Sequence, residues 1–479
     1  MTLPRIAQVG ALALGLAGCA VGTPPTGSDI RQQVAAPIAQ LTPTDPWKAA
    51  PGSTAGIQDN WLATFEDAQL NALVAEAIAW NPDLRVASTK VEQAAQYVQL
   101  ARAALLPQVN VMGSGGAKMG GGDALQVLSL GVSWEPDLWG RLRYGRNAAQ
   151  ESYASAQADF EFARQSIAAT TARSWFTARE SRQQMLIADE MVKASQELVR
   201  LANDRQRIGP GNEQDVALAR VTLGNFQDAA RQAKLAYEQS LRALELVVGR
   251  YPAAEIKASD GLPAFTPALP SGLPLEMLER RPDMIAAERR VAAAFNRVGE
   301  AKAAKLPRIV LSANIAAIQS DILVLKQSYE NPSGGVGGRI AAPIYQGGAL
   351  EAQAEIRTLE QKEAIAQYAR SALRALGDVE NTLGADLTLA QREPVLRAVL
   401  KDNERALALA QTSYRVGRVD QRAVLQQQLS VQVARQALLR VQSEQLSQRV
   451  NLHLVLGGSF ESPPQPPPET TAAASPPPK

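Results

Sequence analysis

The sequence predicts a mainly α-helical chain with a transmembrane β-barrel part, to which one chain contributes four strands in two internal repeats. Three observations lead to this fold class. Long stretches have apolar residues at three- and four-residue steps, two shorter stretches change to alternation, and the same order of features occurs twice. We therefore expect a long helical coiled-coil barrel that continues into a β-barrel.

The bulk composition excludes several kinds of protein. The 479 residues carry a net charge of only +2, so we expect no nucleic-acid partner. There is one histidine, His453, and one cysteine, Cys19, which argues against a disulfide and against a metal site built from His and Cys ligands, and no metal or cofactor is expected. After the first twenty positions no apolar run reaches 18 residues, so no transmembrane helix is expected.

The N-terminus has the features of an export signal. Arg5 precedes an apolar core that is too short to span a bilayer, so residues 1–18 are predicted to be a signal peptide. The sequence LAGC that ends at Cys19 resembles the bacterial lipobox. This resemblance implies acylation of Cys19, and Ala20 favours the outer membrane; the alternative is a plain signal peptide with an incidental cysteine. One acyl chain binds a membrane only moderately, so a second attachment is expected.

Two β-hairpins are predicted within the helical sequence. In the first, VNVMG (109–113) and LSLGVSWE (128–135) alternate apolar with small or polar residues around a glycine-rich turn. The second uses KLPRIVLSAN (305–314) and GGRIAAPIYQGG (337–348). The hairpins are expected at 108–136 and 308–343, with a proline at each junction with a helix: Pro107, Pro136, Pro307 and Pro343.

The chain is predicted to be a duplication with a traceable register. The shift is 307 − 107 = 200 before the hairpins, 343 − 136 = 207 after them, and 417 − 209 = 208 at the tips marked by Gly209 and Gly417. This gives repeats at 61–250 and 275–460. They are flanked by an extended segment (19–60), an equatorial connector (251–274) and a disordered proline-rich tail (461–479).

Each repeat should contain a long helical hairpin. Residues 140–208 contain no proline and would extend about 100 Å as one helix. Small residues such as Ala188, Ser195 and Ala202 recur at helical spacing and would allow close approach of helices. The tips are expected at 208–215 and 416–422, with a returning helix opened by Asp215 and a kink at Pro394.

Four strands cannot close a barrel, and open sheet edges are costly in a membrane. Two chains would give eight strands and an interior filled by side chains, whereas three would give twelve and an aqueous lumen. A homotrimer is therefore expected.

Several segments together resemble a known family. FEDAQLNALVAEAIAWNPDL (65–84), WEPDLWGRLR (134–143), GLPLEMLERRPDMIAAE (272–288) and GEAKAAKLPRIVLSA (299–313) are similar to the TolC-type outer-membrane efflux factors. The similarity is greatest to the NodT-like lipoprotein branch that serves proton-driven (RND) multidrug pumps, and it covers roughly residues 19–460. It implies a homotrimeric barrel in the outer membrane of a Gram-negative bacterium with a periplasmic helical tunnel. It also implies a periplasmic adaptor and an inner-membrane transporter as partners, and a passive exit duct for drugs or other small molecules.

The resemblance also implies a gate at the periplasmic tips. In the family an aspartate at the first tip pairs with a tyrosine and an arginine at the second, positions that Asp215, Tyr414 and Arg415 occupy here. The alternatives are a helix N-cap for Asp215 and a solvated helix end for Tyr414 and Arg415.

At the aperture this sequence departs from the family. Gln426 stands where relatives often carry an aspartate, and Asp420 lies in the turn itself. Weaker block of the conductance by divalent cations is therefore expected. Trp134, Trp139 and Tyr345 lie near the strand ends, either as membrane-interface anchors or as simple packing at those bends.

Three rival interpretations remain open from the sequence. An exit duct for type I protein secretion would share the fold. A non-conducting periplasmic coiled-coil lipoprotein would lack the strands. A hydrolase is disfavoured because one histidine and one cysteine at the lipobox offer no nucleophile–base pair, so the chain is predicted not to be an enzyme.

Overall fold

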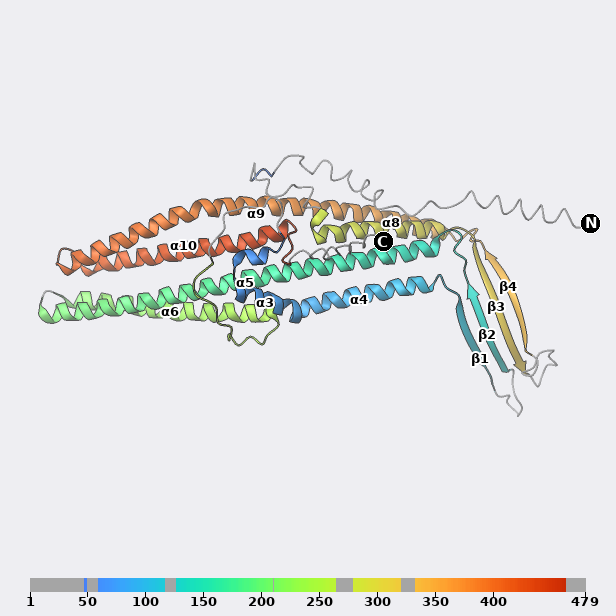
Figure 1. The fold of residues 1–479 in the computed structure, drawn as a ribbon, viewed down its shortest axis with the longest axis horizontal. Coiled ribbons are helices and arrows are strands. Elements are labelled where there is room, and N and C mark those ends of the chain that lie inside the picture. Colours follow the sequence, from blue (N-terminus) through green and yellow to red (C-terminus); the bar gives the residue numbers. More distant parts are fainter. Residues whose placement is uncertain are drawn as a thin grey trace, which may run out of the picture. The chain divides into compact units, whose positions relative to one another are not determined.

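A computed structural model describes residues 47–49, 59–116, 126–209, 211–263, 279–319 and 332–461 (Figure 1). The first repeat contains η1 (Trp61–Phe65), α3 (Ala68–Trp80), α4 (Pro82–Ala103), β1 (Gln108–Ser114), β2 (Gln126–Trp134), α5 (Arg141–Ile208) and α6 (Glu213–Val248). The second contains α8 (Pro282–Ala303), β3 (Arg308–Gln319), β4 (Ser333–Ala341), α9 (Ala349–Arg415) and α10 (Gln421–Val455). The predicted combination of long helices with two β-hairpins is confirmed.

Some sequence predictions fall outside the described residues. These are the signal peptide, the acylation of Cys19, most of the extended segment after it, the connector beyond residue 263 and the tail beyond residue 461. Among the described helices, none combines the length and the apolar character needed to cross a bilayer.

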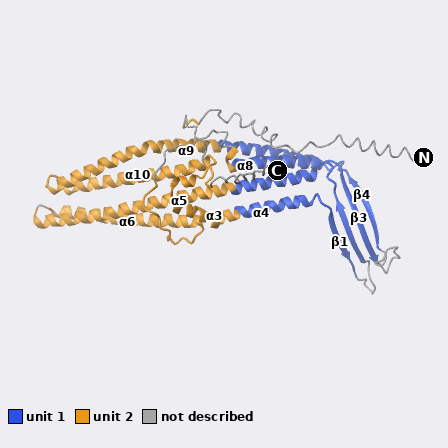
Figure 2. Ribbon diagram, in the orientation of Figure 1, with its two compact units in different colours: residues 1–41, 87–160, 283–373 blue, residues 42–86, 161–282, 374–479 orange. Residues whose placement is uncertain are grey.

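The chain divides into two compact units (Figure 2). Unit 1 comprises residues 1–41, 87–160 and 283–373 and holds all four strands. Unit 2 comprises residues 42–86, 161–282 and 374–479 and holds η1, α3, α6 and α10. Both α5 and α9 contribute residues to each unit, since their bounds cross the divisions at 160 and 373.

The strands of unit 1 form one antiparallel sheet in the order β1-β2-β3-β4. The pairing of β2 with β3 joins the two repeats, with Trp134 opposite Leu311 and Leu128 opposite Ala317. The two hairpins thus lie side by side as a continuous four-stranded sheet, and β1 and β4 are its edges.

The register separates an apolar face from a polar one, because side chains alternate along each strand. On the first face every second residue is apolar or glycine, from Val109 to Gly113, Leu128 to Trp134, Ile309 to Ala317 and Gly334 to Ile340. These side chains are largely exposed in the single chain, for example Val111 at 71% and Val336 at 90%. The opposite face carries most of the polar residues: Gln108, Asn110, Ser129, Ser133, Arg308, Ser312, Asn314 and Arg339.

Two tryptophans fasten the ends of the strands near the helices of unit 1. The Trp134 indole donates a hydrogen bond to the Leu105 carbonyl (3.0 Å), and the Trp139 indole donates one to the Pro307 carbonyl (2.6 Å). The second bond ties the two repeats together beside the junction prolines. Tyr345, by contrast, is 86% exposed.

Helices α5 and α8 approach closely within unit 1. A Cβ atom on Gly299 would lie 2.6 Å from the ring of Tyr144, so only glycine fits against that buried side chain. Further along, the Ser155 hydroxyl donates to the Ala286 carbonyl at 3.1 Å. Gly299, Ser155 and Ala286 are small enough to allow this contact.

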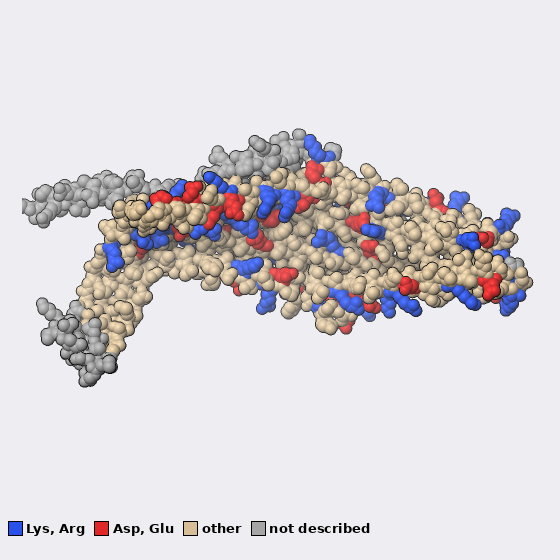
Figure 3. Space-filling view, turned by 180° about the vertical axis from the view of Figure 1, so that it is seen from behind, with Lys and Arg blue, Asp and Glu red and all other residues tan. Residues whose placement is uncertain are grey.

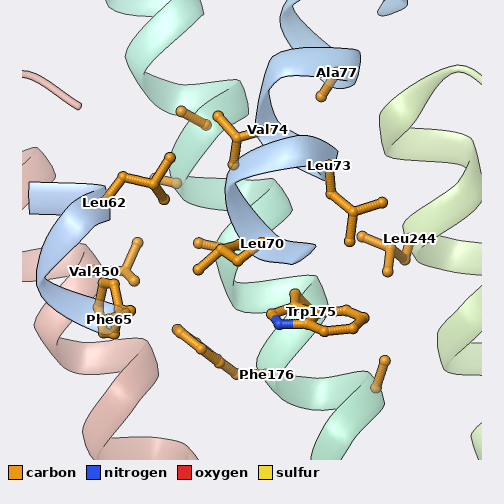
Figure 4. Packing of buried hydrophobic residues seen from close by; sticks show 14 of the residues in the cluster. Leu62, Phe65, Leu70, Leu73, Val74, Ala77, Trp175, Phe176, Leu244 and Val450 are labelled. Carbon is orange, nitrogen blue, oxygen red and sulfur yellow. The ribbon is translucent and has the colours of Figure 1, made fainter. Parts of the chain in front are cut away.

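A large apolar cluster forms the core of unit 2. Leu70 of α3 and Trp175 and Phe176 of α5 are each fully buried within it, and Phe65 of η1 packs against Phe176 at 5.1 Å between ring centres (Figure 4). Burying four large apolar side chains of this kind contributes about 1.5–3 kcal/mol for each one. This cluster joins η1, α3, α5, α6 and α10, elements that are far apart in the sequence.

The small residues predicted to allow close approach of helices are buried in α5. Ala188, Ser195 and Ala202 are each at most 2% exposed. Pro394, where a kink was predicted, lies inside α9, and the helix continues through it to Arg415. The returning helix α6 ends at Gly249, a left-handed cap with φ 83°.

Candidate functional site

The first tip connects α5 to α6 in unit 2. Gly209 adopts φ 106° directly after α5, a conformation that favours glycine. Asn212 then caps α6, because its side-chain oxygen accepts a hydrogen bond from the Asp215 amide at 2.8 Å. The interpretation of Asp215 as the N-cap is therefore wrong. Asp215 lies in the first turn instead, where a carboxylate is favoured by the helix dipole.

The second tip connects α9 to α10. Gly417 adopts φ 74°, and the Arg418 amide donates back to the Ser413 carbonyl at 2.9 Å, which closes the end of α9. Asp420 is the N-cap of α10, with its carboxylate accepting from the Ala423 amide at 3.1 Å. Both tips are thus fixed by one left-handed glycine followed by one capping side chain.

Tyr414 is the anchor of this end of the unit. Its ring is only 7% exposed and packs against Leu198 of α5 and Val424 and Leu425 of α10. The guanidinium of Arg205 lies 4.5 Å from the ring centre, a cation–π contact. Arg205 also donates to the Tyr414 carbonyl at 3.4 Å.

Gln421 extends this contact between the two helical hairpins. It accepts a hydrogen bond from the Tyr414 hydroxyl at 3.5 Å and donates one to the Leu198 carbonyl at 3.4 Å. Both bonds are long, so the packing of the ring contributes more than they do. Arg205 and Gln421 were not predicted from the sequence, because no local pattern shows which residues of α5 contact α9 and α10.

Asp215 and Arg415 are not brought together within the chain. Asp215 is half-buried and Arg415 is exposed, and in the described part of unit 2 no hydrogen bond or ion pair joins either one to the other or to Tyr414. Of the two residues predicted at the aperture, Asp420 is exposed and caps its helix. Gln426 is exposed and lies six residues after Asp420, within α10.

Unit 2 also contains two buried charged clusters that the sequence did not indicate. Arg179 of α5 pairs with Asp67, which also accepts a hydrogen bond from the Trp175 indole at 2.8 Å. In the second cluster, the guanidinium of Arg449 in α10 lies 3.6 Å from the carboxylate of Asp386 in α9. Burial raises the pKa of Asp386, against the opposing effect of Arg449.

The single histidine adjoins the second of these clusters. His453 is 3% exposed, and its ring stacks on Trp61 with 5.8 Å between ring centres. Burial, together with the charge of Arg449, lowers the pKa of His453 to about 4. Within the described ranges, no three side chains of His, Cys, Asp or Glu are gathered in a way that would hold a metal ion.

Comparison with known proteins identifies the family. Residues 73–250 and 273–458 match the model of the outer membrane efflux protein family. The chain belongs to this family. Each matched range contains one pair of long helices and one β-hairpin. The chain is accordingly an outer-membrane component of an efflux system, as the sequence predicted.

Three relatives illustrate the similarity. The pyoverdine export outer membrane protein OpmQ of Pseudomonas putida is 27% identical, over 96% of this chain and 99% of its own length. The cation efflux system protein CusC of Escherichia coli is 29% identical, over 84% of this chain and 88% of its own. The solved structure of the outer-membrane channel OprN is 26% identical, with a TM-score of 0.78 over 88% of this chain and 98% of that one.

Proposed function

We propose that three copies of the chain pool their strands into one twelve-stranded outer-membrane barrel and their helices into a periplasmic tunnel. The assembly is a passive exit duct of a tripartite efflux system. It is not an enzyme, since transport through it follows the gradient that a pump maintains. The observation that carries this proposal is the sheet of unit 1, which has one apolar face, one polar face and two open edges.

The open edges call for partner strands from other chains. The outer edges of β1 and β4 have no strand beside them within the described sheet. In hydrocarbon each unpaired backbone group costs several kcal/mol, so edge pairing between chains is strongly favoured. With the apolar face toward lipid, the polar face lines the lumen, and three sheets enclose a water-filled pore whereas two enclose none.

The names of the relatives favour small cargo. One of the relatives described above is a pyoverdine export protein, and another belongs to a cation efflux system. These cargoes are ions or small molecules. We therefore favour small-molecule efflux over the secretion of a polypeptide for this chain.

The partners follow from the same proposal. A periplasmic adaptor engages the helical tips and joins them to a proton-driven transporter in the inner membrane. An acylated Cys19 anchors each chain to outer-membrane lipid. Because a single acyl chain binds a membrane only moderately, the barrel supplies the second attachment.

The gate lies at the tips of α5–α6 and α9–α10. Within one chain Tyr414 is already held by Arg205, so the remaining latch groups, Asp215 and Arg415, are assigned to contacts between neighbouring chains. An exposed ion pair contributes about 0–1 kcal/mol, and three of them about 0–3 kcal/mol, which is weak enough for an adaptor to open. Gln426 and Asp420 line the aperture, where the absence of an aspartate at 426 weakens block by divalent cations.

Single-channel recording in planar bilayers tests the proposal. Purified full-length protein should cross-link as a trimer and form pores with a low resting conductance. The double substitution Asp215→Ala with Arg415→Ala should raise that resting conductance, whereas Glu213→Ala, also in the first turn of α6, should leave it unchanged. A monomer without channel activity would refute the duct, and an unchanged trace for the double variant would remove these residues from the latch.

A further inference from the structure

The four strands carry only two charged residues between them, and both are arginines. Arg308 is the first residue of β3, and Arg339 is the third from the end of β4. No aspartate or glutamate occurs within the bounds of β1, β2, β3 or β4. On the face of the molecule in Figure 3 the helices show many side chains of both charges, and the sheet surface shows very few.

The register places both arginines on the same face of the sheet. Arg308 is opposite Ala341, and Arg339 is opposite Val310, so the two are diagonal neighbours on adjacent strands. Diagonal neighbours of this kind lie about 7–8 Å apart. Their face is the one with Asn110, Ser133 and Ser312, opposite to the face of apolar side chains.

Neither arginine is neutralised by a carboxylate among the described residues. The carboxylates near this end of the sheet already pair with other cations: Glu135 with Arg141 at 3.0 Å, Asp137 with Arg143 at 3.1 Å, and Glu351 with Lys305 at 3.5 Å. Arg308 and Arg339 are themselves exposed. Each therefore presents a full positive charge on the polar face.

Their position along the strands is also defined. Arg308 directly follows the junction residue Pro307, and Arg339 lies four residues before Pro343. Both are at the end of the sheet that leads into helices, not at the ends that lead into the hairpin turns. Copies of this pair in a symmetric assembly therefore lie at one level of the barrel.

We propose that Arg308 and Arg339 form a ring of positive charge inside the barrel, at its helix-side end, which binds and favours the passage of small anions. The inference rests on the proposed trimer, in which two arginines per chain give six around the lumen. The ligand class is a small carboxylate or phosphate anion, since the guanidinium fork binds both in bidentate fashion.

A ring of one charge is effective in this setting. Charges of one sign on the wall of a narrow, low-dielectric passage concentrate counter-ions within it, and arginine rings are used in this way in anion pores. Screening limits the effect to roughly 10 Å at 0.1 M salt, so it should be strongest at low ionic strength.

The test is the ion selectivity of the full-length channel in planar bilayers under a potassium chloride gradient. The wild-type pore should prefer chloride, and Arg308→Gln with Arg339→Gln should lower the chloride-to-potassium permeability ratio by about threefold or more. The charge-preserving pair Arg308→Lys with Arg339→Lys is the matched control and should keep the wild-type ratio. An equal ratio in the glutamine variant and the wild type would overturn the proposal.

A second measurement uses the wild-type protein alone and does not depend on the variants folding. Citrate added at low salt should reduce the chloride current, and its effect should disappear at about 1 M salt, where the screening length is about 3 Å. A pore that conducts but ignores citrate overturns the arginine ring while leaving the duct intact. A protein that forms no pore overturns the duct and, with it, the ring.

Discussion

Acidification should destabilise unit 2 through its single histidine. His453 is buried against Trp61, and no hydrogen-bond partner for its Nδ1 occurs in the described part of the chain. Burial and the nearby charge of Arg449 lower its pKa from 6.5 to about 4. The unfolded chain therefore takes up this proton at a higher pH than the folded chain does.

The sign and size of the effect follow from these two values. Because the folded pKa is depressed, the stabilisation is complete above pH 6.5 and is lost as the pH falls toward about 4. The full loss is about 3 kcal/mol, and at pH 5 it is already about 2 kcal/mol. Asp386 acts in the opposite sense, since the stabilisation from a raised carboxyl pKa is lost as the pH rises through it.

Guanidinium unfolding of the purified protein between pH 7.5 and pH 5, beside a His453→Phe variant, isolates the histidine contribution. Phenylalanine keeps a ring against Trp61 but cannot be protonated, so the variant should lose about 2 kcal/mol less on acidification than the wild type. Asp386 is present in both proteins, and its contribution is largely removed in the difference. Equal losses in the two proteins, or an NMR titration of His453 near 6.5, would refute the reasoning.

Substitutions at three further positions test the packing of unit 2. Asp67→Ala leaves Arg179 buried without its carboxylate and should lower the free energy of unfolding by about 3–5 kcal/mol. Asp67→Asn keeps a side chain that can cap α3, so its loss should be about 1 kcal/mol smaller. Equal losses of unfolding free energy in the two variants would exclude a contribution from the cap. Gly249→Ala places a Cβ atom 2.7 Å from the Trp80 carbonyl oxygen at φ 83° and should lower the thermal midpoint clearly. Gly224→Ala, in open space within α6, should stabilise by about 0.5–1 kcal/mol instead, and similar shifts in both variants would contradict the steric argument.

Local patterns in the sequence were sufficient for the architecture. The change from helical spacing to alternation marked both hairpins, and the strands at 108–114, 126–134, 308–319 and 333–341 each overlap one of the four segments where alternation was found. The tip glycines Gly209 and Gly417 were recognisable because a sharp reversal after a helix favours a residue that tolerates positive φ. The duplication was visible because both repeats keep the same order of these local signals.

Contacts between distant segments could not be read in this way. The alternative interpretation of Asp215 as the N-cap of α6 is wrong because Asn212 lies closer to the turn and caps the helix, and the sequence does not say which polar residue faces the free amides. Arg205 meets Tyr414 across 209 residues, a pairing that exists only once α5 packs beside α9. Local propensity carries no information about such a meeting.

The choice between helix and strand in each segment could be predicted from the amino-acid sequence, because it depends on neighbours a few residues away. The folded chain alone shows that β3 pairs with β4 in the register that puts Arg308 and Arg339 on one face, and that β2 pairs with β3 to join the two hairpins. A slip of one residue between β3 and β4 would put the two arginines on opposite faces, and this register is set by the packing and hydrogen bonding of the strands in the folded sheet.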